Sequence, residues 1–238
     1  MRTTVTAVNY GINITEYAGG IRFGTDSLLL SAFCRKHGRC ADLGAGSGVI
    51  GLMLLAAKKA PSVTGIELIP EYASLANSNA AANGMEKNYE CICADVNAVR
   101  SLLPAGAYGL CVCNPPYLPA GTGIENEAGL KHAAFHETTA DIGGFCAAAA
   151  YLLKFGGAFA CVYRPEYLAR LVSAMESNSL SLKRLRFVHP DLASPPSLIL
   201  AEARKGGRPG VRVMPPLIVY SDTEHTTYTP EMRGFTEL

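Results

Sequence analysis

The chain has 238 residues, of which 49% are hydrophobic and 17% are charged, and its formal net charge is +1. This composition is typical of a globular chain and excludes an intrinsically disordered one. No apolar run reaches the roughly 18–20 residues of a membrane span, and the N-terminus lacks the apolar stretch of a secretory signal. The eight cysteines show no C-x-x-C spacing, which favours buried, reduced thiols over zinc ligands. We therefore expect a cytoplasmic protein without a membrane or metal partner.

The predicted elements begin with a β-hairpin over residues 3–23, whose turn we expect near Gly19-Gly20. A short helix over 27–34 follows, capped by Thr25-Asp26. From residue 40 onward, strand-like and helix-like runs alternate. The predicted strands are 40–43, 62–67, 89–94, 108–113, 157–163, 181–189 and 197–204, and the predicted helices are 48–58, 70–83, 138–154 and 165–178.

Apolar strands that alternate with helices predict an α/β fold with a mostly parallel, seven-stranded sheet and helices on both faces. The last two strands follow each other without an ordinary helix between them, so we expect one antiparallel strand at the edge. The whole chain, 1–238, is predicted to be one domain. Its parts are an N-terminal hairpin and helix over 1–36, a core over 37–204 and a C-terminal extension over 205–238.

A glycine loop, Asp42-Leu43-Gly44-Ala45-Gly46-Ser47-Gly48, joins the first core strand to a helix. Its glycines let the backbone approach a ligand closely. The G-x-G-x-G spacing and the carboxylate of Asp42 disfavour a dinucleotide site, because a carboxylate opposes pyrophosphate but attracts an ammonium group. Glu67 and Asp95 end the next two strands, at the same edge of a parallel sheet. Glu67 suits two ribose hydroxyls, and Asp95 suits the amine of an adenine ring.

The most specific motif, Asn114-Pro115-Pro116-Tyr117, follows the fourth core strand. It resembles the [D/N]-P-P-[Y/F] motif of methyltransferases that act on planar nitrogens, whose delocalised lone pair makes them poor nucleophiles. The Asn114 side-chain oxygen and the Pro115 carbonyl can accept the two N–H bonds of such a nitrogen and aim its lone pair at a methyl donor. The prolines stiffen the loop, and Tyr117 can stack on a flat substrate. Catalysis would then rest on alignment and electrostatics.

Together, the glycine loop and the acids resemble the class I methyltransferases. The resemblance implies a Rossmann-like fold, the cofactor S-adenosyl-L-methionine and the product S-adenosyl-L-homocysteine. It also implies a set of residues that bind the cofactor, with the glycine loop against its methionine portion. The expected set is Thr25, Asp42, Gly44, Ala45, Gly46, Gly48, Glu67, Leu68, Asp95, Val96 and Asn114.

Segments outside the glycine loop and the N-P-P-Y motif resemble the bacterial tRNA(Val) adenine-N(6) methyltransferases. The similar segments are residues 21–30, His136-Glu137, Val188-His189-Pro190, residues 201–207, residues 215–220 and Tyr228-Thr229-Pro230-Glu231. The resemblance implies a tRNA partner and transfer to the exocyclic amine of an adenine. Residues 183–213 carry seven basic and two acidic residues, as a surface that contacts phosphates would. The expected substrate contacts are Tyr117, Lys131, Arg164, Arg204, Lys205 and Arg208.

Other acceptors remain open at this point. A protein glutamine N-methyltransferase acting on a release factor shares the N-P-P-Y motif, although such enzymes carry a helical N-terminal domain where this chain has a predicted hairpin. An rRNA N-methyltransferase and a non-catalytic module that binds S-adenosylmethionine are further alternatives. Residues 120–134 depart from the tRNA family pattern, so the acceptor stays open. The sequence carries no signal for an oligomeric state.

Overall fold

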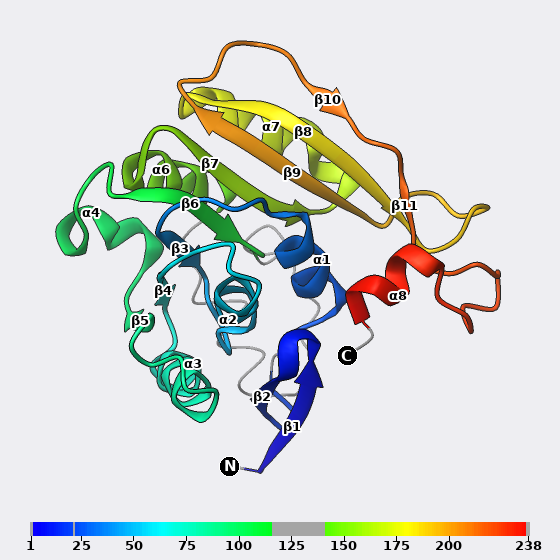
Figure 1. The fold of residues 1–238 in the computed structure, drawn as a ribbon. Coiled ribbons are helices and arrows are strands. Elements are labelled where there is room, and N and C mark those ends of the chain that lie inside the picture. The colour runs from blue at the N-terminus through cyan, green and yellow to red at the C-terminus, as the bar shows by residue number, and fades with distance from the viewer. Residues whose placement is uncertain (1, 21, 116–140, 237–238) are drawn as a thin grey trace.

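A nine-stranded sheet forms the centre of the computed structural model, which describes residues 2–20, 22–115 and 141–236 (Figure 1). The strand order is β10-β8-β9-β7-β6-β3-β4-β5, and β11 also pairs with β8. Only β9 runs antiparallel to its neighbours in this sheet. The strands are β3 (Cys40–Leu43), β4 (Val63–Glu67), β5 (Tyr89–Cys93), β6 (Tyr108–Cys113), β7 (Leu153–Tyr163), β8 (Leu180–His189), β9 (Leu198–Lys205), β10 (Arg212–Val213) and β11 (Leu217–Ile218).

The predicted fold class, a mostly parallel sheet with helices on both faces, is confirmed. Two details differ from the expectation. The antiparallel strand β9 lies between β7 and β8 and not at the edge. After β8 the chain reverses direction, and β9 pairs with β8 on one side and with β7 on the other. The sheet is also wider than seven strands, because the C-terminal extension adds β10 and β11 along β8. Each of these is two residues long, which is too short for a periodic sequence signal.

Helices cover the two faces of the sheet in separate groups (Figure 1). One face holds α1 (Thr25–Phe33), α2 (Val49–Ala56) and α3 (Pro70–Ala82), with α8 (Pro230–Thr236) beside them. The other face holds α4 (Val99–Leu102), α6 (Ile142–Leu152) and α7 (Leu168–Ser177). In the described ranges, no helix has both the length and the apolarity to cross a membrane.

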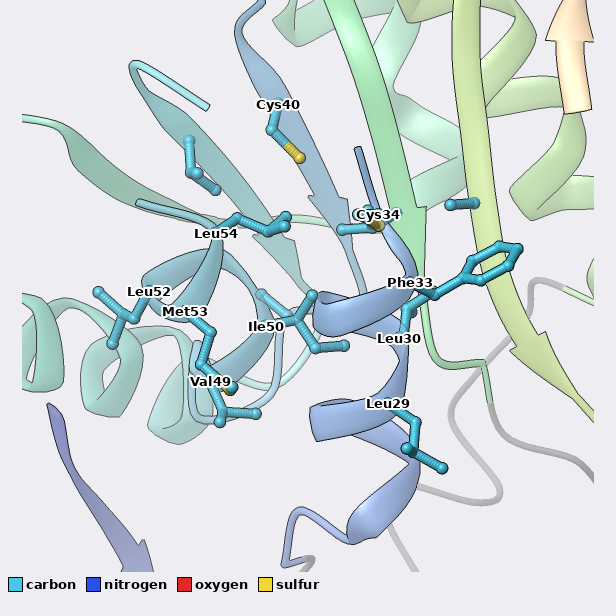
Figure 2. Packing of buried hydrophobic residues seen from close by; sticks show 14 of the residues in the cluster. Leu29, Leu30, Phe33, Cys34, Cys40, Val49, Ile50, Leu52, Met53 and Leu54 are labelled. Atoms are coloured by element: carbon cyan, nitrogen blue, oxygen red, sulfur yellow. The ribbon is translucent and has the colours of Figure 1, made fainter. Parts of the chain in front are cut away.

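The sheet residues alternate between these two layers with the period of a β-strand. In β6, Leu110 and Val112 pack with α1 and α2, whereas Cys111 and Cys113 pack with α6. Figure 2 shows the first layer, in which Leu30 of α1 and Ile50 and Met53 of α2 are all buried. Both faces of the strands are covered, which is why the strands are apolar throughout.

The cysteines are all unpaired, and seven of the eight are buried. The prediction of buried small thiols is therefore confirmed except at Cys93, which is exposed. Burial raises the pKa of Cys34 to about 12, so this thiol stays protonated. A protonated, enclosed thiol packs as a small apolar side chain and is a poor nucleophile.

The N-terminal hairpin consists of β1 (Thr3–Val8) and β2 (Ile12–Tyr17). Its turn is at Asn9–Gly11, not near Gly19-Gly20, which follow the second strand. Tyr10 and Gly11 both adopt left-handed backbone angles, with φ of 67° and 68°, so a tyrosine carries half of a turn that favours glycine. The sequence pattern missed this turn because Tyr10 is not a turn former.

The hairpin is fixed to the core through the side chain of Asn79 in α3. The Asn79 amide accepts from the backbone N–H of Thr15 at 2.9 Å and donates to its carbonyl at 3.0 Å. Asn79 Nδ2 also donates to the carbonyl of Ser47, at 2.9 Å. Asn79 is 1% exposed, so one buried side chain holds the hairpin and the glycine loop together.

Candidate functional site

The glycine loop after β3 lies at the carboxyl edge of the sheet, where β4, β5 and β6 also end. Gly44, Gly46 and Gly48 have φ of 74°, 55° and 82°, which is the left-handed region that side chains disfavour. A Cβ on Gly48 would lie 2.7 Å from the Tyr89 hydroxyl. The loop therefore keeps this course only with glycine at these positions. At Gly46 a Cβ would meet no heavy atom of the described residues within 4 Å, so the backbone there is open to close approach by a ligand. Ala45 is buried beneath it.

The carboxylate of Glu67 connects the ends of two strands. Its Oε2 accepts from the N–H of Gly46 at 2.8 Å, and its Oε1 accepts from the N–H of Ile69 at 3.0 Å. Burial raises the pKa of Glu67 above its ordinary value, although these backbone N–H groups oppose the shift. A carboxylate that accepts one bond at each oxygen retains acceptor capacity, so Glu67 can also receive hydroxyl groups of a ribose.

Asp42 is fully buried between β3 and α2. Its Oδ2 accepts from the N–H of Gly51 at 3.1 Å, whereas its Oδ1 has no hydrogen-bond partner among the described residues. Burial raises the pKa of Asp42 to about 7. An unsatisfied buried carboxylate oxygen is costly, and a cationic donor nearby would reduce that cost. The glycine turn and the unsatisfied Asp42 oxygen both fit a ligand with an ammonium group.

Asp95 follows β5 at the same edge and is half-buried. Its Oδ1 accepts from the N–H of Asn97 at 2.7 Å, so it caps the short 3-10 helix Val96–Ala98. The N–H of Ala94 donates to the Glu67 carbonyl at 2.8 Å, which brings the two acidic strand ends together. Leu68 is half-buried and Val96 is buried beside these carboxylates. The structure thus places Asp42, Glu67 and Asp95 at one edge of the sheet, as the sequence predicts.

Thr25 is the exposed first residue of α1. The predicted cap at Thr25-Asp26 is wrong in position, because the N-cap residue is Gly24 in extended conformation and both residues are already helical. Asp26 still serves the first turn, since its Oδ1 accepts from the N–H of Ser27 at 2.8 Å. Its other oxygen, Oδ2, accepts a hydrogen bond from Asn114.

Asn114 directly follows β6 and is half-buried. Its Nδ2 donates to Asp26 Oδ2 at 2.9 Å and to Ser27 Oγ at 3.2 Å. Pro115 is buried beside it. The first turn of α1 therefore contacts the start of the N-P-P-Y motif. The sequence analysis assigns Asp26 only to a helix cap and does not predict its contact with Asn114. The one sequence signal for that contact is the position of Asp26 in the Gly24-Thr25-Asp26-Ser27 segment.

Several predicted positions lie outside the described residues. They are Pro116, Tyr117, Lys131, residues 120–134 and His136-Glu137. Their expected roles remain predictions. In the part of the chain that the structure describes, no group of three or more His, Cys, Asp or Glu side chains is arranged to hold a metal ion.

The predicted phosphate contacts separate into two places. Arg164 follows β7 at the carboxyl edge, is exposed, and donates to the Ser197 carbonyl at 3.4 Å. Arg204 and Lys205 end β9 at the opposite edge. The register across the sheet pairs Arg204 with Ala158 of β7, which is in line with Leu110 of β6 and Cys40 of β3. Asn114 is four residues further along the strands, about 13 Å at 3.3 Å per residue.

Two basic side chains at that opposite edge bind backbone carbonyls in the first residues of β7. Lys205 Nζ donates to the Leu153 carbonyl at 2.8 Å, and Arg204 Nη1 donates to the Gly156 carbonyl at 3.0 Å. Arg208 follows β9 and is exposed. The structure therefore brings Arg164 to the carboxyl edge with the acids and Asn114, and it does not bring Arg204, Lys205 and Arg208 there.

Comparisons with known proteins agree with this geometry. Residues 18–177 match the methyltransferase small domain family. A tRNA1(Val) (adenine(37)-N6)-methyltransferase from Photobacterium profundum is 30% identical over 189 residues, which are 77% of this chain and 77% of that one. A release factor glutamine methyltransferase from Deinococcus radiodurans is 38% identical over 97 residues, 40% of this chain and 32% of that one. The crystal structure of a predicted O-methyltransferase from Agrobacterium tumefaciens superposes with a TM-score of 0.70 at 25% identity, covering 88% of this chain and 94% of that chain.

Proposed function

Because the chain belongs to the methyltransferase small domain family, we propose that it transfers a methyl group from S-adenosylmethionine to the exocyclic amine of an adenine in tRNA. One observation carries the choice of acceptor. The similarity to the tRNA1(Val) (adenine(37)-N6)-methyltransferase covers 77% of both chains. A likeness of that extent includes more of the chain than the cofactor-binding core that many methyltransferases share. Adenine 37 of tRNA(Val) is accordingly the first acceptor to test.

The carboxyl edge of the sheet would hold the cofactor. We assign the backbone of Gly44–Gly48 to its methionine portion, Glu67 to the ribose hydroxyls and Asp95 to the adenine amine. The unsatisfied oxygen of Asp42 supports an ammonium group nearby, and Thr25, Leu68 and Val96 are assigned to the walls of the site. When bound, S-adenosylmethionine supplies a methyl group on a positively charged sulfur.

Asn114 and Pro115 would hold the acceptor. The Asn114 side-chain oxygen and the Pro115 carbonyl accept the two N–H bonds of the adenine amine. Both bonds favour a pyramidal nitrogen whose lone pair is no longer shared with the ring. Transfer then requires alignment of this nitrogen with the methyl group, and such alignment accounts for much of the rate enhancement in reactions of this kind.

Contacts with the rest of the tRNA are assigned to separate residues. We place Tyr117 on the face of the flipped base and Lys131 and Arg164 on phosphates near it. Arg204, Lys205 and Arg208 lie at the opposite edge of the sheet, so they suit only phosphates distant from the reacting base. A tRNA acceptor and eight unpaired thiols support the expectation that the activity is cytoplasmic.

Glutamine methylation of a release factor is the second candidate. Its supporting observation is the 38% identity to a release factor methyltransferase. That match covers 40% of this chain and 32% of the relative, so it reflects only the core that the two kinds of methyltransferase share. The match to the tRNA1(Val) (adenine(37)-N6)-methyltransferase covers 77% of both chains, which favours the tRNA acceptor.

The test is an assay with methyl-labelled S-adenosylmethionine and unmodified tRNA(Val). We expect label in this tRNA and none in a matched transcript with guanine at position 37. Unmethylated release factor and rRNA serve as competing acceptors in parallel reactions. Label in the release factor and not in tRNA would overturn the proposal. Cofactor binding by calorimetry without transfer to any acceptor would instead indicate a non-catalytic module.

A further inference from the structure

The first turn of α1 holds the side-chain amide of Asn114 in one orientation. We infer that Asp26 is a positioning residue for methyl transfer, because its carboxylate directs the Asn114 amide nitrogen toward α1 and the amide oxygen toward the acceptor. The inference rests on the proposed methyl transfer to a planar nitrogen, but it does not depend on whether that nitrogen belongs to RNA or protein.

The hydrogen-bond chemistry allows only one orientation. Asn114 Nδ2 lies 2.9 Å from Asp26 Oδ2 and 3.2 Å from Ser27 Oγ. A carboxylate can only accept hydrogen bonds, so the amide nitrogen, and not the oxygen, must face it. Rotation of the amide by half a turn would set its oxygen against the carboxylate oxygen. The acceptor role of Asn114 needs the orientation that Asp26 selects.

Asp26 is itself held in place. Its Oδ1 accepts from the N–H of Ser27 at 2.8 Å, and that N–H also donates to the Gly24 carbonyl at 3.2 Å. Ser27 is 3% exposed. The carboxylate therefore uses one oxygen within α1 and the other for Asn114, across 88 residues of sequence.

The helix that carries Asp26 is rigidly attached to the core. Leu29, Leu30 and Phe33 are buried in the layer shown in Figure 2. At its other end, Lys59 Nζ donates to the carbonyls of Ser31 and Ala32 at 2.7 and 2.8 Å. Arg184 Nη2 donates to the Phe33 carbonyl at 2.9 Å. A fixed helix can hold a partner side chain within the tolerance that catalysis needs.

A reciprocal swap tests the inference. In Asp26→Asn, residue 26 can donate or accept, so the Asn114 amide loses its orientation, and we expect kcat to fall about tenfold or more. In Asn114→Asp, two carboxylates meet where one amide stood, and we expect a larger loss. In the double variant, the amide introduced at position 26 donates to the carboxylate introduced at position 114, whose second oxygen can accept from the substrate. We expect the double variant to be at least about tenfold more active than Asn114→Asp.

The controls separate positioning from folding. Asp222→Asn removes the same type of carboxylate from a turn in which it accepts from the N–H groups of Thr226 and Thr227, and we expect kcat within about twofold of the unaltered protein. Thermal melting and cofactor affinity are measured for every variant. Multiplicative losses in the double variant, with all variants folded, would overturn the inference.

A second measurement does not require turnover. In Asn114→Asp, two adjacent carboxylates should share a proton, so NMR titration should show one carboxyl pKa raised by about one unit or more. The shift should vanish when Asp26→Asn is added. Two ordinary titrations in Asn114→Asp would show that the contact does not exist. If the unaltered protein methylates nothing, the proposed function fails, and this titration still decides the contact.

Discussion

At the residue scale, burial determines the charge that each acid of the site can carry. Asp42 is enclosed completely, with one hydrogen bond from Gly51 at 3.1 Å, and its pKa is raised to about 7 by that burial. Glu67 is also buried and has a raised pKa, but two backbone N–H groups stabilise its charged form. The ionisation of Asp42 therefore changes near neutral pH.

Cofactor affinity should follow the ionisation of Asp42. A cationic ligand favours the ionised carboxylate, so affinity should rise as pH increases through about 7 and binding should release a proton. Above pH 8 affinity should level off or fall, because an α-amino group loses its proton near pH 7.7–8.0 as an order-of-magnitude guide. Calorimetry in two buffers of different ionisation enthalpy measures both effects.

Asp42→Asn is the matched control for this titration. The amide keeps the shape of the side chain but cannot ionise. We expect weaker cofactor binding with little pH dependence between about pH 6 and 7.5. Proton uptake on binding, or the same pH profile in Asp42→Asn, would contradict the assignment of the titrating group to Asp42.

Asn114 stands in the set expected to bind the cofactor, but the proposed function gives it its main role in the chemical step. Asn114→Ala removes the side-chain acceptor from the reacting amine, so kcat should fall by about 100-fold or more. Cofactor affinity should change only a few-fold. Single-turnover rates and calorimetry on the same protein measure the two quantities. A kcat near that of the unaltered protein would remove the acceptor role.

At the element scale, the glycine loop is set by what packs under it. Gly48 is the N-cap of α2 and has a φ of 82°, and Tyr89 from β5 lies directly beneath it. Asn79 of α3 accepts from Thr15 of the hairpin and donates to Ser47 in the loop. A helix, a strand and the hairpin thus all support one turn of backbone.

Gly48→Ala should damage both stability and cofactor binding. The new Cβ would lie 2.7 Å from the Tyr89 hydroxyl and 3.2 Å from the Ala76 side chain, in addition to the strained φ. We expect a loss of about 2–3 kcal/mol in the free energy of unfolding and a clear drop in cofactor affinity. Urea unfolding and calorimetry measure these changes.

Gly84→Ala provides the comparison. Gly84 has a φ of 67°, but its Cβ would meet no heavy atom within 4 Å. It follows α3, away from the loop. Only the backbone strain of about 1 kcal/mol should remain, with cofactor affinity unchanged. Equal losses in the two variants would mean that Tyr89 does not restrict the loop.

At the scale of the whole molecule, the acids of the site and two basic residues of β9 lie at opposite edges of the sheet. Asp42, Glu67 and Asp95 gather at the carboxyl edge, whereas Arg204 and Lys205 end β9 at the opposite edge. A net charge of +1 conceals this separation. Basic side chains away from the reacting base can contribute to the binding of a polyanion without reading its sequence.

Arg208→Ala should weaken tRNA binding without altering the chemistry. If Arg208 neutralises one phosphate, the slope of log affinity against log salt should decrease in magnitude by about 1. The rate of methyl transfer at saturating tRNA should be unchanged. Filter binding at several salt concentrations measures the slope, with Lys87→Ala, an exposed lysine before β5, as control. An unchanged slope in Arg208→Ala would exclude a phosphate contact there.

Sequence by itself determined the parts of this protein that depend on local chemistry and on the rules of parallel sheets. The strand Tyr108–Cys113 is found as predicted, because a continuous apolar run of six residues has the length of a buried strand and is too short for an ordinary helix. The gathering of Glu67 and Asp95 at one edge was also predictable, since parallel strands all end there. The N-P-P-Y motif needed no structure to indicate a planar nitrogen.

Only the tertiary structure decided which distant segments meet. The antiparallel direction of β9 places Arg204 and Lys205 at the edge opposite the site, although their charges alone suggested a substrate contact. The bond from Asn114 to Asp26 joins residues 88 positions apart, and no local pattern encodes it. Such contacts arise from the packing of α1 against the sheet, which depends on shape complementarity over many buried residues. The orientation of the amide in the N-P-P-Y motif is therefore a property of the fold and not of the motif.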